Sequence, residues 1–211
     1  MELGVRVTLH HVIAAWLRAE LCSPCFRDYL QTDDSDLRII KDPDVTNADE
    51  NIRRRQLIAY RGGIIEDIAN STEWREATLG VDDLAGLFAS PYPSWELFSG
   101  CTGKIIRVAE AVRNGVRLRV CDRAVQQSLD EISKHVGEIY AGLGGESVRG
   151  RLILLARSLL GPYTVIEGTK RATALCWRHC LETVPCYGTP AFVGITARPS
   201  PFLSPHGSSE T

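Results

Sequence analysis

A short segment in the second half of the chain has the residue types of an anion-binding turn. Residues 163–175 read Tyr-Thr-Val-Ile-Glu-Gly-Thr-Lys-Arg-Ala-Thr-Ala-Leu, which predicts a strand, a tight turn and a helix. Gly168 permits the unusual backbone angles of such a turn and lets an anion approach the main chain. The N–H groups of residues 169–171 are then expected to lie unpaired at the positive end of the helix dipole, an arrangement that favours phosphate.

The side chains of this turn add to its chemistry. Thr169 supplies a hydroxyl, Lys170 a positive charge and Arg171 a guanidinium fork, all suited to phosphate oxygens. Glu167, at the end of the predicted strand, has the chemistry of a general base or of a metal ligand. An ordinary strand–helix turn, with Thr169 as helix cap and Arg171 paired to a surface carboxylate, explains the same residues, because Gly-x-x-Arg is a weak pattern.

The elements around the turn follow a particular order. A helix over residues 123–141, a Gly-rich loop, a buried strand at 151–157 and a turn at 159–162 precede it, and a last strand is expected at 190–196. This order, with a strand followed by (Asp/Glu)-Gly-x-x-Arg and a helix, resembles the ParB/sulfiredoxin-like superfamily. The resemblance covers roughly residues 116–197, which is less than half of the chain.

The resemblance implies a nucleotide-binding domain. Members of the superfamily include chromosome-partition CTPases, sulfiredoxins and ADP-dependent free serine kinases, and their loop binds nucleotide phosphates. Carried over to this chain, the phosphate would lie against Gly168, Thr169, Lys170 and Arg171. Glu167 would begin the motif, and the cofactors would be ATP or ADP (or CTP) with Mg²⁺ bridging the phosphates.

The chain departs from the family pattern in three ways. Lys170 stands where family members often have His, and Thr169 stands where a sulfiredoxin has its nucleophilic Cys, so sulfinic-acid repair is disfavoured. The segment after the last strand, residues 197–211, is too short for the helix-turn-helix domain of a partition protein. What the resemblance leaves is a nucleotide-binding domain with a helical N-terminal extension.

A second carboxylate is a candidate for catalysis. Kinase-like members of the superfamily use an acid placed before the first helix of the unit, and Asp122, in Val-Cys-Asp-Arg, is the nearest equivalent. Asp122 is equally well placed to cap the helix over residues 123–141, and we favour that interpretation.

Cysteines form two candidate metal-binding groups. Cys22 and Cys25 make a Cys-x-x-Cys, while Cys176, His179 and Cys180 fall on one predicted helix, so four of these side chains would suffice for zinc. The first pair lacks a zinc-knuckle context. Buried free thiols and a hydrogen-bonded core histidine are therefore the better interpretation.

Arginines cluster on a helix expected from Asn51 to about residue 70, although Gly62-Gly63 inside it argues against an unbroken helix. They are Arg53, Arg54, Arg55 and Arg61. Three successive arginines cannot share one face, so a solvated helix with one or two acidic partners is the simplest account. The alternative is that one arginine crosses to the phosphate site.

Three aromatic residues flank turns and are expected in the core, or else around a pocket between the two halves: Trp74, Trp95 and Phe98.

Composition narrows the classes of function. The chain has 211 residues, of which 24 are basic and 26 acidic, giving a net charge of −2. A dedicated duplex-DNA binder usually carries a clear basic excess, so nucleic acid is a disfavoured partner. No apolar run is long enough to cross a membrane, and residues 1–6 do not resemble a signal peptide, so we expect a cytoplasmic protein with reduced cysteines.

The elements predict an α+β protein divided near residue 115. Residues 1–115 form a mainly helical region, 116–198 a small ParB/sulfiredoxin-like α/β domain, and 199–211 a disordered tail. In the first region we expect a strand at 4–9, a helix through residues 12–19, a loop at 31–50 and a helix at 105–112; the second would open with a strand at 116–120.

The leading functional interpretation is a nucleotide-dependent phosphotransferase that acts on the hydroxyl group of a small molecule. Glu167 or Asp122 would remove the proton of that hydroxyl. A non-catalytic nucleotide-binding regulatory module and a ParB-like nuclease are the alternatives. The sequence leaves open whether turnover occurs, which acceptor is used and which oligomeric state the chain adopts.

Overall fold

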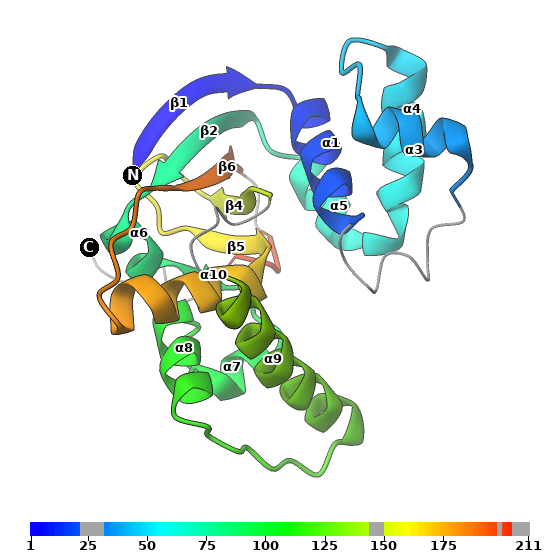
Figure 1. Cartoon of the computed structure of the whole chain (residues 1–211). Coiled ribbons are helices and arrows are strands. Elements are labelled where there is room, and N and C mark those ends of the chain that lie inside the picture. Colours follow the sequence, from blue (N-terminus) through cyan, green and yellow to red (C-terminus); the bar gives the residue numbers. More distant parts are fainter. Residues whose placement is uncertain (22–31, 144–149, 198–199, 204–211) are drawn as a thin grey trace.

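The chain folds around one mixed β-sheet with helices on both faces (Figure 1). The computed structural model describes residues 1–21, 32–143, 150–197 and 200–203. Over these residues the sheet has six strands in the order β1-β2-β6-β4-β5-β3. The protein is therefore α+β, as predicted. None of the helices in the described part is long and apolar enough to span a bilayer.

The strands are β1 (Glu2–Val7), β2 (Glu73–Leu79), β3 (Phe88–Ala89), β4 (Leu152–Ala156), β5 (Thr164–Glu167) and β6 (Thr189–Ile195). The helices before residue 115 are α1 (Leu9–Glu20), α3 (Asp34–Lys41), α4 (Ala48–Ile58), the 3₁₀ turn η1 (Ala59–Arg61), α5 (Gly63–Ala69), α6 (Val81–Gly86), α7 (Pro93–Phe98) and α8 (Ile105–Arg113). After it come α9 (Arg123–Gly142), α10 (Thr169–Cys176) and the π-helical turn η2 (Trp177–Leu181).

The strand pairing joins the two halves of the chain. Strand β6 is antiparallel to β2 and parallel to β4, while β5 is antiparallel to β4 and parallel to β3. Strands β1, β2 and β3 all precede residue 115. The boundary expected near that residue therefore falls within one sheet and does not separate two sheets.

Each face of the sheet has its own apolar core. In β4, which is buried along its whole length, Leu152 and Leu154 pack in one core and Ile153 and Leu155 in the other. Helices α8, α9 and α10 cover the first core, and α1, α3, α4 and α5 cover the second (Figure 1). Coverage on both faces explains why this strand has a continuous apolar sequence.

Most elements predicted after residue 100 are present, but the strand expected at residues 116–120 is not. In the described structure no strand lies beside this segment to supply backbone partners. Leu118 and Val120 pack against the first core instead, and the segment stays extended between α8 and α9. The alternation of apolar and charged residues at 116–120 therefore reflects a segment that packs one side against the core without forming a strand. The helix predicted after Gly168 changes to a π-helical turn after Cys176.

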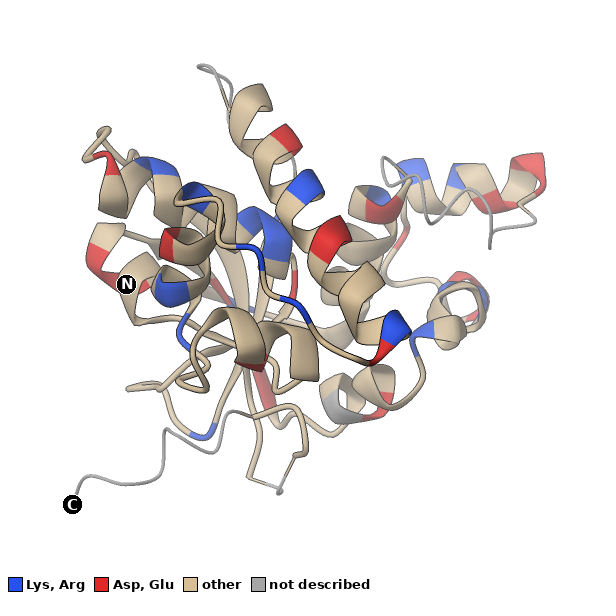
Figure 2. Ribbon diagram, turned by 90° about the horizontal axis from the view of Figure 1, so that it is seen from below, with Lys and Arg blue, Asp and Glu red and all other residues tan. Residues whose placement is uncertain are grey.

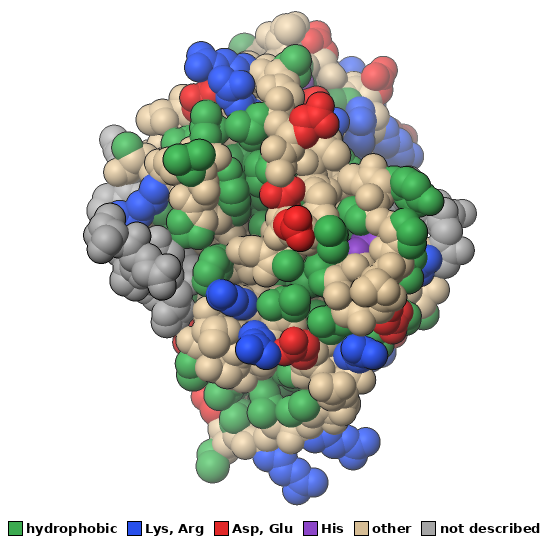
Figure 3. Space-filling model, turned by 90° about the vertical axis from the view of Figure 1, so that its left-hand side faces the viewer, with side chains coloured by type: hydrophobic (Ala, Val, Ile, Leu, Met, Phe, Trp, Pro, Cys, Tyr) green, Lys and Arg blue, Asp and Glu red, His purple; other side chains and the backbone are tan. Residues whose placement is uncertain are grey.

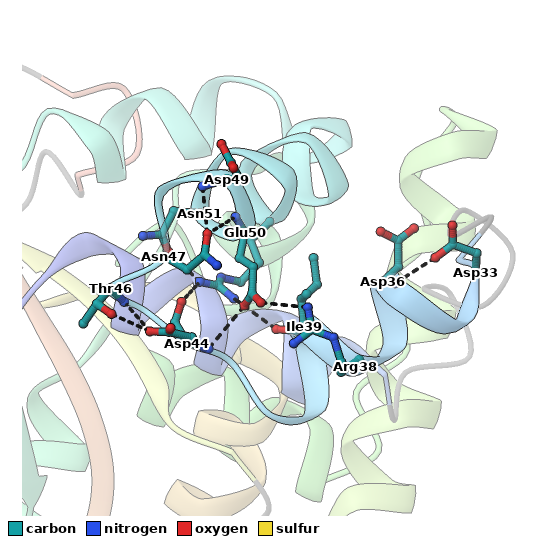
Figure 4. Close-up of polar contacts among 11 residues, drawn as sticks. Asp33, Asp36, Arg38, Ile39, Asp44, Thr46, Asn47, Asp49, Glu50 and Asn51 are labelled. Atoms are coloured by element: carbon teal, nitrogen blue, oxygen red, sulfur yellow. Dashed lines mark hydrogen bonds and ion pairs between the residues drawn. The ribbon is translucent and has the colours of Figure 1, made fainter.

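The loop expected at residues 31–50 is wrong for the part that is described, because α3 and the start of α4 lie there. The polar residues behind that expectation are helix caps (Figure 4). Asp33 accepts a hydrogen bond from the Asp36 N–H at 2.8 Å. Asn47 accepts from the N–H groups of residues 49 and 50, so α4 begins before the expected cap, Asn51.

A buried arginine of α4, Arg54, links this helix to α3 and to the segment between them. Arg54 is 1% exposed and pairs with Glu50 at 3.1 Å. It also donates to the carbonyl oxygens of Ile39 and Asp44 and to the Asn51 side chain. Its neighbour Arg53 pairs with Asp36 at 2.7 Å. Two of the three successive arginines thus have acidic partners, as predicted, although Arg54 is buried and not solvated.

The predicted helix from Asn51 to residue 70 is interrupted at its glycines. Helix α4 ends at Ile58, η1 follows, and Gly62 has φ +56° and ψ −134° before α5 begins. Non-glycine residues rarely adopt such angles, so the glycine permits the break. As a result, Arg61 lies at the end of a short turn and not on a continuous helix.

The three aromatic residues expected in the core are buried there: Trp74, Trp95 and Phe98 are at most 9% exposed.

Candidate functional site

The predicted strand–turn–helix is present at the end of β5. Gly168 has φ +87°, in the left-handed region, and α10 begins at the next residue. A Cβ atom at this position would lie 2.8 Å from the Leu152 side chain, so there is no room for a larger residue. The Gly168 carbonyl accepts from the Ala172 N–H at 2.8 Å, which closes the first turn of the helix. Glycine is thus required here by both backbone angle and space.

Glu167, the last residue of β5, forms an ion pair with Arg61 of η1. The Glu167 side chain is 17% exposed and that of Arg61 is 30% exposed. An arginine from the N-terminal region therefore does cross to the predicted site, which was the less simple of the two interpretations offered for the arginine cluster.

Glu20, at the end of α1, adds a second carboxylate to the same place. One of its oxygens accepts a hydrogen bond from the Trp16 indole N–H at 3.0 Å and lies 3.8 Å from an Arg61 nitrogen. The Arg61 guanidinium lies over the rings of Trp16 and Tyr60, at 5.2 Å and 5.9 Å from their centroids. Arg61 is therefore held between two carboxylates and two aromatic rings.

Arg171 completes the cluster from the first turn of α10. Its guanidinium lies close to two glycines: a Cβ atom built on Gly150 would be 2.9 Å from Arg171 Nη1, and one on Gly168 would be 3.7 Å from Cζ. Among the described residues it makes a single hydrogen bond, a long one of 3.4 Å, to the Arg151 carbonyl. The guanidinium thus keeps most of its donors for other partners.

We call Glu20, Arg61, Glu167 and Arg171 the charged cluster. Burial raises the pKa of Glu167, with the field of Glu20 acting in the same direction and those of Arg61 and Arg171 opposing it. Burial lowers the pKa of Arg171. Burial by itself would lower the pKa of Arg61 too. The fields of Glu167 and Glu20 outweigh burial, so the pKa of Arg61 is raised. Burial therefore dominates at Glu167 and at Arg171, and it shifts the pKa of each toward neutral pH.

The other residues predicted for the site point to different places. The Lys170 amine lies 3.0 Å from His135 Nδ1 on α9. Thr169 is half-buried at the start of α10, and its carbonyl accepts from the Thr173 hydroxyl at 2.9 Å. The structure thus brings Glu167, Gly168 and Arg171 together, with Lys170 turned toward α9.

Asp122 is a helix cap and lies outside the charged cluster. Its carboxylate accepts hydrogen bonds from the N–H groups of Ala124 and Val125, at 2.8 Å and 3.1 Å. It lines a shallow hollow whose other walls are Pro93, Glu96, Leu97, Cys101, Val120 and Val125, none of which belongs to the cluster. The capping role favoured from the sequence is the one that the structure shows.

Zinc has no ready site among the described residues. No group of three or more His, Cys, Asp and Glu side chains there is arranged to hold a metal ion. Cys176 is buried and hydrogen-bonds Cys180, and His179 Nδ1 lies 2.8 Å from the Val184 carbonyl. Cys22 and Cys25 lie outside the described residues.

Sequence patterns missed Glu20 altogether and could not place Arg61. Glu20 is the single acid at the end of an apolar helix, and nothing in its spacing indicates that it faces β5. Arg61 reaches Glu167 only because the chain breaks at Gly62. No family model, curated protein sequence or solved structure matches this chain.

Proposed function

We propose that the chain binds a nucleotide through its phosphates at the turn 168–171 and transfers a phosphoryl group to the hydroxyl of a small molecule. One observation carries this proposal: Arg61 and Arg171 come from opposite halves of the chain to flank Glu167 where the glycine turn begins. The proposal includes membership of the ParB/sulfiredoxin-like superfamily, which rests on the Glu-Gly-Thr-Lys-Arg motif and its order of elements.

The donors of the cluster fit phosphate oxygens. The Arg61 Nε atom is buried and has no hydrogen-bond partner among the described residues, although a buried donor normally has one. Among the described residues, Arg171 makes one long hydrogen bond, to a carbonyl. Guanidinium groups bind phosphate through two parallel hydrogen bonds, and Gly168 lets a phosphate approach the N-terminus of α10.

Glu167 fits the role of general base. Its raised pKa brings its proton affinity closer to that needed near neutral pH. In the described structure Arg61 occupies this carboxylate. A phosphate that draws Arg61 to itself would release Glu167 to take the proton of the acceptor hydroxyl, while the hydroxyl oxygen bonds to phosphorus and the bond to the leaving nucleotide breaks.

Magnesium would be held mainly by the nucleotide. Glu20 and Glu167 are the carboxylates of the cluster, and Arg61 and Trp16 already engage their oxygens. Mg²⁺ commonly binds through one or two carboxylates together with substrate phosphates, and it would neutralise charge on those phosphates. The residues present fit this limited role and no all-protein magnesium site.

The Arg61–Glu167 ion pair also favours a second candidate, a nucleotide-binding module without turnover. If Arg61 and Glu167 remain paired when nucleotide binds, Glu167 has no role as a base. The cluster then binds the nucleotide without catalysing a reaction.

Phosphorus NMR separates the two candidates. Purified protein is incubated with ATP, ADP or CTP and Mg²⁺, with and without a panel of hydroxyl metabolites. The kinase predicts a new phosphoester signal that Glu167→Gln reduces about 100-fold or more, the usual contribution of a general base. Nucleotide binding with no new signal supports the module, and absence of binding contradicts both.

A further inference from the structure

The segment that joins α8 to α9 is a basic stretch of the described surface. Residues 104–123 contain six Lys and Arg and two Asp and Glu, in a chain with 24 basic and 26 acidic residues overall. The rest of the chain therefore has an excess of acid. Figure 2, seen from below, shows this connecting segment running across the near side to the start of α9.

Four arginines of this segment form what we call the basic strip: Arg113, Arg117, Arg119 and Arg123. All four are exposed, and no carboxylate of the described residues pairs with any of them within 4.0 Å. Some arginines elsewhere do have acidic partners: Arg53 and Arg54 pair with acids of their own region. Acidic groups near the strip have other partners, since Asp122 caps α9 and Glu110 pairs with Arg107.

The backbone fixes the direction of these side chains. Leu118 and Val120 are half-buried against the first core, and the Val120 N–H donates to Gln126 at 3.1 Å. Because side chains alternate along an extended chain, Arg117 and Arg119 both point outward, roughly 7 Å apart. In Figure 3, basic side chains lie at the lower end of the molecule, where Figure 1 places this connecting segment. The strip is thus a group of exposed arginines that make no ion pair with the described carboxylates.

We propose that the basic strip binds the phosphate backbone of a nucleic-acid duplex, independently of the charged cluster. Exposed, unpaired guanidinium groups in a row match regularly spaced phosphates, whose counterions they displace. A duplex fits better than a single strand, because the strip includes no aromatic side chain on which bases would stack. Its charge complements the ligand locally even though the chain as a whole is slightly acidic.

Fluorescence anisotropy with a labelled 30-base-pair duplex tests the proposal. With four phosphate contacts, raising NaCl from 50 to 200 mM is expected to weaken binding about 100-fold. The double variant Arg117→Ala/Arg119→Ala is expected to bind at least tenfold more weakly at 50 mM and to lose about half of the salt dependence. DNA and RNA duplexes are measured separately, since both carry the same backbone charge.

A matched control removes the same charge elsewhere. Arg18 and Arg55 are exposed on α1 and α4 and have no ion pair among the described residues, so Arg18→Ala/Arg55→Ala is expected to bind like the parent protein. Equal losses in the two double variants would show a non-specific charge effect and overturn the proposal. So would absence of duplex binding at 50 mM, or preferential binding of a poly-glutamate peptide.

Discussion

Arg61 forms an ion pair with Glu167, 106 positions later in the chain. The pair links the turn after α4 to the end of β5, and Glu20 and Arg171 surround it. Two residues of this cluster belong to the predicted motif and two come from the N-terminal region. The N-terminal region is therefore part of the candidate site.

Replacing Gly168 by alanine should destabilise the protein by about 1–3 kcal/mol, because the new Cβ atom would meet strained backbone angles and the Leu152 side chain. Urea denaturation measures the loss. Gly137 is the matched control: it lies inside α9 with nothing within 4 Å of a built Cβ, so Gly137→Ala should stabilise the helix by about 0.5–1 kcal/mol. Equal effects at the two positions would contradict the argument.

Removing Arg61 should leave Glu167 without its ion-pair partner. Because Arg61 is 30% exposed, solvent reduces the effect, and we expect Arg61→Ala to lower the free energy of unfolding by about 1–2 kcal/mol at pH 7. Arg55→Ala, at an exposed position of α4, should stay within about 0.5 kcal/mol of the parent protein. A loss at Arg61 no larger than that at Arg55 would mean that the pair contributes nothing to stability.

The raised pKa of Glu167 predicts a pH dependence of stability. The folded protein keeps this proton to higher pH than the unfolded chain does, so the contribution of Glu167 is complete below the ordinary value of 4.5 and declines as pH rises through the folded pKa. Between pH 5 and 8 the parent protein should therefore lose stability relative to Glu167→Gln, measured by urea denaturation. A relative gain over that range would show that attraction to Arg61 outweighs burial.

Asp122 should matter to α9 and not to nucleotide binding. Asp122→Ala removes the side-chain cap and is expected to destabilise the protein by about 1 kcal/mol, whereas Asp122→Asn keeps a capping side chain and should be nearly neutral. Both variants should bind nucleotide like the parent protein in titration calorimetry. Loss of phosphoryl transfer in Asp122→Asn with intact stability would restore the catalytic role considered for this residue.

Local patterns predicted the elements with strong periodicity or a required glycine. The apolar run of β4, the stripe of α9 and the Gly168 turn follow from spacing and side-chain type alone. Strand β2 was not predicted, because its sequence, Glu-Trp-Arg-Glu-Ala-Thr-Leu, is half polar and its pairing with β6 is long-range. Helix α3 is short and begins with acidic residues, and its capping residues resemble those of a loop.

The candidate site was predictable only where its residues are neighbours in sequence. Gly168 and Arg171 follow Glu167 within one motif, so one pattern includes all three. Glu20 and Arg61 reach them through the packing of α1 and η1 against the sheet, and no local spacing encodes that arrangement.

The central claim, that nucleotide phosphate binds at the turn, is tested most directly by titration calorimetry of ATP, ADP and CTP with Mg²⁺ against the parent protein, Arg171→Ala and the control Arg18→Ala. Loss of a charge-assisted hydrogen bond of about 1.5–3 kcal/mol corresponds to at least a tenfold weaker affinity. We predict that loss in Arg171→Ala and unchanged affinity in Arg18→Ala. Equal affinity of Arg171→Ala and the parent protein for the nucleotide would contradict the account.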